Sequence, residues 1–455
     1  MNPPAAASEP LPSRWTNRRL LVLIWPLVID QLLIVLMGII DTVMVAYLGE
    51  EAVGGVSLAD SINVVLLQAF SFLAAGGAVV CSQFLGKRDN KSARSAARQL
   101  IYTVASLSGL LSLVMLAARS AVFHGIYGHI EPGIMVQAEK YFFFTAMSYP
   151  FIALSTAGSA LYRSMGNSHV GMWISFLVNI LNVLGNALFI FVFKWGVAGA
   201  ALSTLLSRFA AAAVLLGMLY RARGTPITLE GIFRVHVDMP LIKRILKVGV
   251  PNGVEGAIFQ VGKLALSRLV STFGTPAIAG YAVTNIIMTI GNLPGLAVAT
   301  AMMPVVGQCV GAGDTKSAVR YTKKLILLSY FIMGILNLGF ILFMPVFFGF
   351  FRLSPESLGI ARQGGLIFCT AAIFIWNFAY CLPYALRASG DAAYTMIVAT
   401  LAMWFVRVGF AYVLARFFGV GVVCVWVSMV CEWLVRGCFF LFRWKSGKWK
   451  EKRLV

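Results

Sequence analysis

Long apolar stretches separated by short polar segments run along the whole chain. A helix needs roughly 20 apolar residues to cross a hydrocarbon core of about 30 Å. Stretches of at least that length lie at about 20–48, 53–85, 97–118, 141–162, 168–193, 196–220, 242–272, 277–310, 322–350, 358–386, 391–415 and 419–442. Runs this long exclude the alternating strands of a membrane barrel, which are about ten residues each. The pattern predicts an all-α polytopic membrane protein with twelve transmembrane helices.

The second half of the chain repeats the first half with an offset of 225 residues. Matching pairs include Pro26 and Pro251, Gly49 and Gly274, Gln83 and Gln308, Gly86 and Gly311, and Asp89 and Asp314, while Arg163 and Arg387 match at an offset one residue shorter. Each copy contains six predicted helices, so both copies enter the membrane in the same direction. Such parallel repeats are related by a pseudo-two-fold axis along the membrane normal, and two homologous lobes fit alternating access around a site between them.

Polar segments divide the chain into five parts. Residues 1–13 are rich in Pro, Ala and Ser and are expected to be a disordered tip. The N-lobe is predicted at 14–220 and the C-lobe at 241–443. Between them, charge, Gly and Pro interrupt the apolar pattern over 221–240, which predicts a cytoplasmic linker. Residues 444–455 are expected to be a basic cytoplasmic tail.

The composition excludes a soluble domain. Hydrophobic residues make up 59% of the chain and charged residues only 12%, whereas a soluble protein carries about 25% charged residues. The mean hydropathy is +0.84.

The net charge of +20 at first suggests a nucleic-acid partner, but the basic residues sort by loop. Those at the N-terminus, after the second and eighth helices, in the linker and in the tail are Arg14, Arg18, Arg19, Lys87, Arg88, Lys91, Arg94, Arg98, Arg221, Arg223, Arg234, Lys243, Arg244, Lys247, Lys316, Arg320, Lys323, Lys324, Arg443, Lys445, Lys448, Lys450, Lys452 and Arg453. The opposite loops carry few. By the positive-inside rule, both termini and the linker are cytoplasmic, in an inner or plasma membrane. Membrane lipids, and not nucleic acid, are therefore the expected surroundings.

Asp41 is the leading candidate for chemistry. It lies eight residues before Gly49, so it sits about 12 Å below the outer end of its helix, within reach of an ion from outside. A charged group inside the membrane is expensive and typically serves transport or pairs with a partner. Burial favours the neutral carboxyl and a bound cation favours the carboxylate, so proton release and cation binding can compete there. A buried structural pair is the alternative.

Three amides share one face of the fifth predicted helix. Asn179, Asn182 and Asn186 are spaced i, i+3 and i+7, which marks a polar cavity wall. These amides, and Thr204 in the sixth helix, are positioned to hydrogen-bond Asp41 if the helices share a lobe. Interhelical amide bonds that only hold the bundle together are the alternative.

Other polar residues in apolar runs have two interpretations each. Asp30 and Glu255 follow the matched prolines by four residues, which suggests a second coupling or gating pair, although an acid in an early turn also meets the positive end of the helix dipole. Gln260 and Lys263 lie in the middle of the seventh helix and are candidates for a substrate cavity; no partner for Lys263 is evident. Glu432 and Arg436 have the i, i+4 spacing of an ion pair.

Several segments together resemble the multidrug and toxic compound extrusion (MATE) family. They are GIIDTVMVAYLGEEAVGGVSLAD (38–60), SQFLGKRDNKSA (82–93) with its repeat GQCVGAGDTKSA (307–318), LYRSMGN (161–167) with LRASGD (386–391), and WGVAGAALST (195–204). The resemblance covers almost the whole chain and implies two six-helix lobes around a V-shaped central cavity.

The resemblance implies an antiporter that exports organic cations in exchange for protons or sodium ions. We expect the substrate to be a lipophilic organic cation and the protein to be a monomer. The resemblance matches Asp41 to the family's helix-1 aspartate, with a Na⁺ site possible there, and Asn182, Asn186 and Thr204 to its N-lobe partners. The chain departs from the pattern in three places. Asn186 stands where some members carry a second aspartate, and the tenth predicted helix carries no acid. Glu255 lies closer to the start of the seventh helix than the acid that some members carry there.

Other functions have less support. A flippase for a lipid-linked precursor is the alternative transporter, because Lys263, Arg208 and Arg407 make the cavity more cationic. The chain lacks a GxxxxGK[ST] loop for ATP, an HExxH sequence and a nucleophile motif, so neither a nucleotide-driven pump nor a membrane enzyme is expected, and no cofactor beyond the coupling ion. The duplication argues against a receptor or scaffold.

Overall fold

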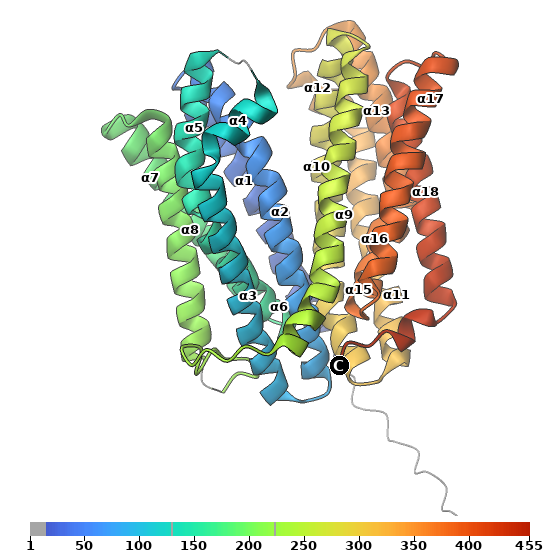
Figure 1. Cartoon of the computed structure of the whole chain (residues 1–455). Helices are drawn as coiled ribbons and strands as arrows, with labels where there is room; N and C mark the ends of the chain where they lie inside the picture. The colour runs from blue at the N-terminus through green and yellow to red at the C-terminus, as the bar shows by residue number, and fades with distance from the viewer. Residues whose placement is uncertain (1–14, 129–130, 223) are drawn as a thin grey trace, which may run out of the picture.

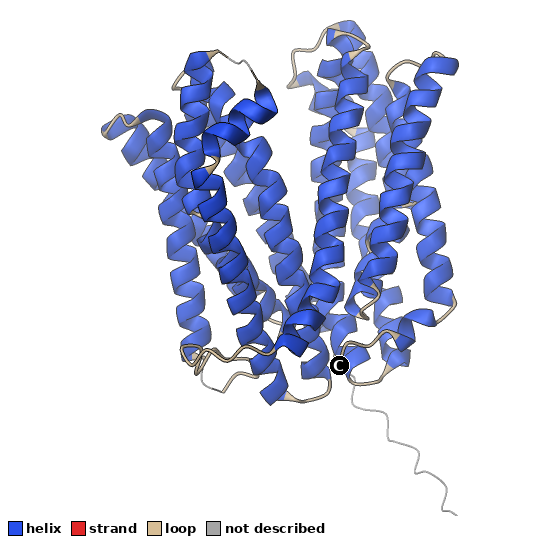
Figure 2. Ribbon diagram, in the orientation of Figure 1, coloured by secondary structure: helices blue, strands red, loops and turns tan. Residues whose placement is uncertain are grey.

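The computed structural model describes residues 15–128, 131–222 and 224–455, and within them every regular element is a helix (Figure 2). The tip expected at 1–13 lies outside the described residues. The helices form two bundles, one from each half of the chain, that converge at the end of the molecule where the C-terminus lies and stand apart at the other end (Figure 1).

The N-terminal bundle contains the helices of the first repeat. They are α1 (Asn17–Ala46), α2 (Glu50–Gly86), α3 (Asn90–Ala117), α4 (Arg119–Tyr127), α5 (Pro132–Met147), α6 (Tyr149–Ser164), α7 (His169–Asn186) with the π-helical turn η1 (Ala187–Val192), and α8 (Gly196–Arg221).

The C-terminal bundle contains the helices of the second repeat. They are α9 (Met239–Ser271), α10 (Thr275–Gly311), α11 (Thr315–Leu342), α12 (Met344–Gly349), α13 (Pro355–Phe374), α14 (Trp376–Tyr380), α15 (Leu382–Ala388), α16 (Ala392–Leu401) with the π-helical segment η2 (Ala402–Gly409), α17 (Phe410–Phe417), α18 (Val423–Lys445) and the short 3₁₀ turn η3 (Lys448–Glu451).

Ten helices of the described chain are long and apolar enough to cross a membrane. The α5–α6 pair and α9 complete six membrane-length rods in each bundle. α5 and α6 are short separately, with 16 residues each, and α9 carries several charged and amide side chains that lower its hydropathy. The predicted fold, an all-helical membrane bundle built from two six-helix repeats, is confirmed.

One helix predicted as continuous is broken. The stretch expected at 141–162 is divided at Ser148 into α5 and α6. Pro150 follows the break and has no N–H, so the carbonyl of Ala146 loses its helical donor. The hydroxyl of Ser112 in α3 donates to this carbonyl instead, at 2.8 Å. The stretch expected at 358–386 is similarly divided into α13, α14 and α15.

At the end of the molecule where the bundles converge, called the inner end below, each bundle buries a helix end of the other bundle. Leu20, Leu23 and Leu27 of α1 belong to the apolar core of the C-terminal bundle. In the second repeat, Ile245 and Val248 of α9 belong to the core of the N-terminal bundle. Because each inner end is buried in the opposite bundle, the bundles interlock at this end of the molecule.

Matched residues of α2 and α10 contact the opposite bundle. The side-chain amide of Gln83 donates to the carbonyl of Ala388 at 2.8 Å, and that of Gln308 donates to the carbonyl of Ser164 at 2.7 Å. A Cβ atom on Gly86 would lie 2.2 Å from the carbonyl oxygen of Gln308. Only glycine permits this approach.

The tail is docked against the same junction. Trp449 is fully buried and stacks on Trp444 at 4.2 Å between ring centroids, within the core of the C-terminal bundle. Leu454 instead belongs to the core of the N-terminal bundle, and its N–H donates to the side-chain oxygen of Gln83 at 3.0 Å. The last residues therefore connect the two bundles.

Candidate functional site

A chain of hydrogen bonds leads from Asp41 into the N-terminal bundle. The amide of Asn186 donates to the Asp41 carboxylate at 2.6 Å and is also 3.2 Å from the side-chain oxygen of Asn182. The amide of Asn182 donates to the hydroxyl of Thr204 at 3.2 Å. The structure thus brings together all four residues predicted from sequence for the coupling site.

Helix geometry explains this arrangement. Asn182 and Asn186 lie one turn apart on α7, on the side that faces α1 and α8. On α8, Thr204 is held by its own bond to the carbonyl of Ala200 at 3.1 Å, and Ser203 donates to the carbonyl of Asn182 at 2.8 Å. The π-helical turn η1 begins directly after Asn186, and such turns occur frequently at functional sites.

Asn179 does not take part in this chain. Its amide donates to the carbonyl of Ser175 at 2.8 Å, one turn earlier on α7. The side-chain oxygens of Asn179 and Asn186 are both buried with no hydrogen-bond partner in the described residues. Each is an oxygen acceptor available to a cation.

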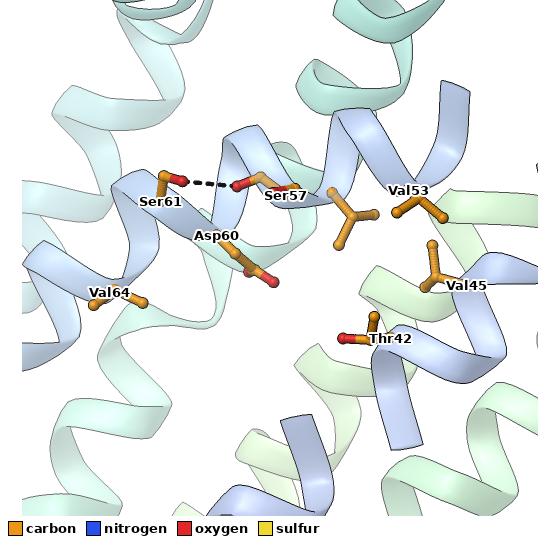
Figure 3. A pocket seen from close by; sticks show the side chains of 8 residues that line it. Thr42, Val45, Val53, Ser57, Asp60, Ser61 and Val64 are labelled. Atoms are coloured by element: carbon orange, nitrogen blue, oxygen red, sulfur yellow. Dashed lines mark hydrogen bonds between the residues drawn. The ribbon is translucent and has the colours of Figure 1, made fainter. Parts of the chain in front are cut away.

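A second acid, Asp60 on α2, lies beside this group and was missed by the sequence analysis. It lines a pocket of about 350 Å³ between α1 and α2. Figure 3 shows its carboxylate directed toward the segment of α1 that carries Thr42, the neighbour of Asp41. The charge of Asp60 acts on Asp41. An acid within a long apolar run was the signal that identified Asp41, and it applies equally to Asp60.

The remaining lining of this pocket is mostly apolar or hydroxylic. The complete set is Thr42, Val45, Val53, Val56, Ser57, Asp60, Ser61 and Val64. The hydroxyl of Ser61 donates to the carbonyl of Ser57 at 2.9 Å and so is occupied locally (Figure 3). Asp60 is therefore the charged group of the pocket.

A polar network connects Asp60 to the break between α5 and α6. The amide of Asn63 donates to Asp60 at 3.2 Å, and the hydroxyl of Tyr149 donates to Asn63 at 2.7 Å. The guanidinium of Arg208 donates to the hydroxyl of Ser148 at 2.7 Å, and its charge acts on both Asp41 and Asp60. The cluster therefore contains two carboxyl groups and one guanidinium, and no ion pair between Arg208 and either acid is found in the described residues.

Asp30 and Glu255, the symmetric acids, each have an arginine nearby. Asp30 accepts a hydrogen bond from Ser175 and interacts electrostatically with Arg163. Glu255 binds Arg387, the repeat counterpart of Arg163, at 2.7 and 2.8 Å. Because they lie in different bundles, the two acids do not form one site. Their partners agree with a structural role as well as with gating.

The C-terminal bundle holds a larger ion network. Arg436 donates to Glu432 at 2.9 Å, which is the ion pair expected from their spacing, and its other end lies 3.4 Å from Glu255. Arg407 of η2 lies 3.7 Å from Glu432. Every residue of this network except Glu255 is less than one tenth exposed.

Gln260 and Lys263, the candidates for a substrate cavity, lie on α9 beside this network. Gln260 is half-buried and Lys263 is exposed. The charge that acts on Lys263 is that of Arg407, which has the same sign. In the described residues no ion-pair partner of Lys263 is found, and no group of three or more His, Cys, Asp or Glu side chains is placed to hold a metal ion.

Comparisons with known proteins agree with this architecture. YisQ of Bacillus subtilis, called an uncharacterized transporter, is 27% identical over 95% of both chains. A probable multidrug resistance protein NorM of Thermotoga maritima is 25% identical over 96% of this chain and 94% of the relative.

Solved structures share the fold. A crystal structure of MATE in the bent conformation matches with a TM-score of 0.87 and 20% identity, over 95% of this chain and 96% of the other. A transporter of the MOP superfamily from Pyrococcus furiosus, whose binding pocket is described as having reverse polarity, matches with a TM-score of 0.86 and 21% identity, over 95% and 96%.

The two repeats are also recognised separately. The MatE family model matches residues 26–188 and again residues 251–413, and the two matches are offset by the same 225 residues as the internal repeat. On these grounds the chain is a multi-pass membrane protein that belongs to the MatE (MATE) family of transporters.

Proposed function

We propose that this protein is a secondary active antiporter that exports organic cations in exchange for protons or sodium ions by alternating access. The observation that carries the proposal is the Asp41 carboxylate, half-buried and hydrogen-bonded to Asn186, with the second acid Asp60 beside it. The names of the relatives support drug efflux. A transporter, not an enzyme, is the class of protein proposed.

Coupling would arise because a proton, a sodium ion and a cationic substrate compete for the Asp41 carboxylate. A proton neutralises Asp41, and a sodium ion would use the carboxylate together with the unpartnered side-chain oxygen of Asn186, since hard cations take oxygen ligands. A cationic substrate attracted to the same carboxylate is displaced when either ion binds. Loading of the coupling ion and release of the substrate are thereby linked at one site.

The exchange of inner helix ends supports a rocking motion of the two lobes. The lobes touch through matched surfaces at one end, so a second state that opens this end and closes the other is compatible with the pseudo-symmetry. We place the interlocked end and both termini in the cytoplasm of a cell membrane, with the protein as a monomer. A membrane potential supplies about 2.3 kcal/mol per charge for each 100 mV, which is enough to drive efflux.

The test is Asp41→Asn in proteoliposomes loaded with a fluorescent organic cation, with proton and sodium gradients imposed separately. Asparagine keeps the volume and removes the titratable group, so gradient-driven efflux is expected to be abolished while membrane insertion is retained. Asp89→Asn is the matched control, because Asp89 caps α3 outside the membrane and asparagine caps helices equally well. Efflux at the wild-type rate from Asp41→Asn would refute the coupling role.

A flippase for a lipid-linked precursor is the second candidate, favoured by the basic network of the C-terminal bundle. The pocket of reverse polarity described for the Pyrococcus furiosus relative is in line with a substrate other than a simple cation. Translocation of a fluorescent lipid-linked precursor across proteoliposome membranes, with no efflux of organic cations, would favour this candidate.

A further inference from the structure

The charges that meet in the C-terminal bundle do not balance. The acids are Glu255 and Glu432, and Arg387, Arg407 and Arg436 pair with them. A fourth basic residue, the exposed Lys263, lies within electrostatic range of Arg407. Two basic groups therefore exceed the acids at membrane depth, opposite in sign to the acidic cluster around Asp41.

Two of the arginines are committed to the acids. Arg387 donates to both oxygens of Glu255, at 2.8 and 2.7 Å, and its Nε donates to Thr395 at 3.2 Å. Arg436 donates to Glu432 at 2.9 Å and to Glu255 at 3.4 Å. Arg407 shares Glu432 with Arg436 but forms no hydrogen bond to it. Three arginines thus share two carboxylates, which leaves one positive charge in excess in the network, and Lys263 adds a second.

Arg407 retains its hydrogen-bonding capacity. It is only 5% exposed, and its contact with Glu432, at 3.7 Å, is too long for a hydrogen bond. Its Nε is buried without an acceptor in the described residues, and the guanidinium lies over the ring of Phe259 at 5.5 Å. A guanidinium has five N–H donors, and leaving a buried donor such as this Nε unsatisfied is costly. An oxyanion would satisfy it.

Lys263 lies on the same face of α9 as Phe259, one turn further along. The preceding residue, Gly262, packs directly against Met403 of η2, where a Cβ atom would lie 2.3 Å from the methionine methyl group. This contact holds α9 against the segment that carries Arg407. The ammonium of Lys263 is exposed, and no hydrogen bond or ion pair of it is found in the described part of the chain.

This face of α9 continues the contact with the other bundle. Gly256 packs on Phe72 of α2, with 2.1 Å from an added Cβ to the ring. Gln260 and Lys263 follow one and two turns further on along α9, the helix that leads from the junction toward the end where the bundles stand apart (Figure 1). Lys263 therefore lies beyond the contact of Gly256 with Phe72, and its side chain is exposed.

We propose that Arg407 and Lys263 form a binding site for an oxyanion, a carboxylate or a phosphate group. The planar guanidinium binds such a group through two hydrogen bonds, and the ammonium adds a point charge. This inference rests on the proposed transport function and narrows its substrate class. The exported molecule carries an acidic group for the C-terminal bundle as well as a cationic group for the acidic cluster around Asp41. An anionic lipid headgroup has the same oxyanion chemistry.

The test compares two forms of one rhodamine dye by fluorescence anisotropy with the purified full-length protein in detergent. The ethyl ester is a cation, and the free carboxylic acid is a zwitterion. Loss of one charge-assisted hydrogen bond corresponds to about a tenfold or greater change in affinity. In Lys263→Gln the Kd of the free acid is expected to rise about tenfold, while the Kd of the ester stays within about twofold of wild type.

Two further variants complete the comparison. Arg268→Gln removes an exposed basic residue from the same helix and is expected to leave both Kd values unchanged. Arg407→Lys keeps the charge and removes the planar fork, so it also weakens binding of the free acid selectively, provided that gel filtration shows folded protein. Equal losses for both dyes in Lys263→Gln, no loss for either, or no binding of the free acid to the wild type would overturn the proposal.

The source of the oxyanion is resolved by adding phosphatidylglycerol to micelles that otherwise contain phosphatidylcholine. If a soluble substrate supplies the group, the added lipid leaves binding of the free acid unchanged. If the lipid headgroup occupies the site, it weakens binding of the free acid to the wild type but not to Lys263→Gln. These are equilibrium measurements without an ion gradient, so their failure is distinguishable from a failure of the coupling role of Asp41.

Discussion

A close backbone contact between the two bundles, at Gly311, predicts the effect of a single methyl group. In Gly311→Ala the added Cβ would lie 2.0 Å from the carbonyl oxygen of Gln83. A carbon and an oxygen in contact are normally about 3.3 Å apart or more. The obstacle is backbone, which cannot rotate away as a side chain can. α2 and α10 must therefore move apart by about 1 Å if the methyl group is to fit.

The magnitude follows from what this separation disturbs. Overpacking in a close contact costs about 1–3 kcal/mol. The reciprocal bonds of Gln83 to Ala388 and of Gln308 to Ser164, at 2.8 and 2.7 Å, also lengthen, and each contributes about 0.5–1.5 kcal/mol. A total of about 2–4 kcal/mol would shift the equilibrium away from the interlocked arrangement by about 30-fold or more.

Spin labels on matched lysines report this shift. Lys91 and Lys316 are exposed, related by the internal repeat and located near the inner ends of the two bundles. After Cys438, the exposed cysteine, is replaced by serine, both lysines are changed to cysteine and labelled. Pulsed electron paramagnetic resonance then gives the distance distribution, which is expected to move to longer distances in Gly311→Ala.

The matched control is Gly334→Ala. Gly334 lies inside α11 and has nothing within 4 Å of the position of an added Cβ, so this change is expected to leave the distances unchanged. Gly86→Ala, the repeat counterpart, should reproduce the effect of Gly311→Ala. If Gly311→Ala gave the wild-type distribution, the reasoning that this contact holds the bundles together would be refuted.

Two further predictions concern stability and the tail. Glu432→Gln leaves buried guanidinium groups without a counter-charge, so the free energy of unfolding is expected to fall by about 3–5 kcal/mol, as measured in mixed micelles titrated with sodium dodecyl sulfate. The control Glu356→Gln, at an exposed position, should change it by no more than about 0.5 kcal/mol. Equal changes in the two variants would contradict the prediction. Deletion of residues 446–455 removes Trp449 and the hydrogen bond to Gln83. Backbone hydrogen exchange at the ends of α2 and α10 that meet at the junction, measured by mass spectrometry, should then become faster. Unchanged exchange would show that the tail does not hold the junction.

Much of the architecture could be predicted because membrane insertion imposes strict local requirements. Apolar runs of sufficient length predict spans, and the 225-residue offset predicts matched lobes. The breaks were harder to predict. The division of α5 from α6 depends on Pro150 and also on Ser112, a residue of another helix that satisfies the freed carbonyl. No local pattern reveals such a donor.

The candidate site was predictable in part for the same reason. Asp41 and the amides of α7 stand out because polar side chains are rare in apolar runs and share a helical face. Asp60 met the same criterion and was overlooked. Its position beside Asp41 depends on how α1 and α2 pack, and spacing within one helix carries no information about a neighbour on the next.

The chain alone establishes the spans, the duplication, the sorting of charge between loops and the polar stripe of α7, since each follows from the local cost of placing polar groups in lipid. Three-dimensional packing settles which charges meet. It gives Glu255 two arginines, leaves Arg407 and Lys263 in excess, and docks the tail on Gln83. These outcomes join residues far apart in sequence, and such pairings arise only when the helices of both bundles are assembled.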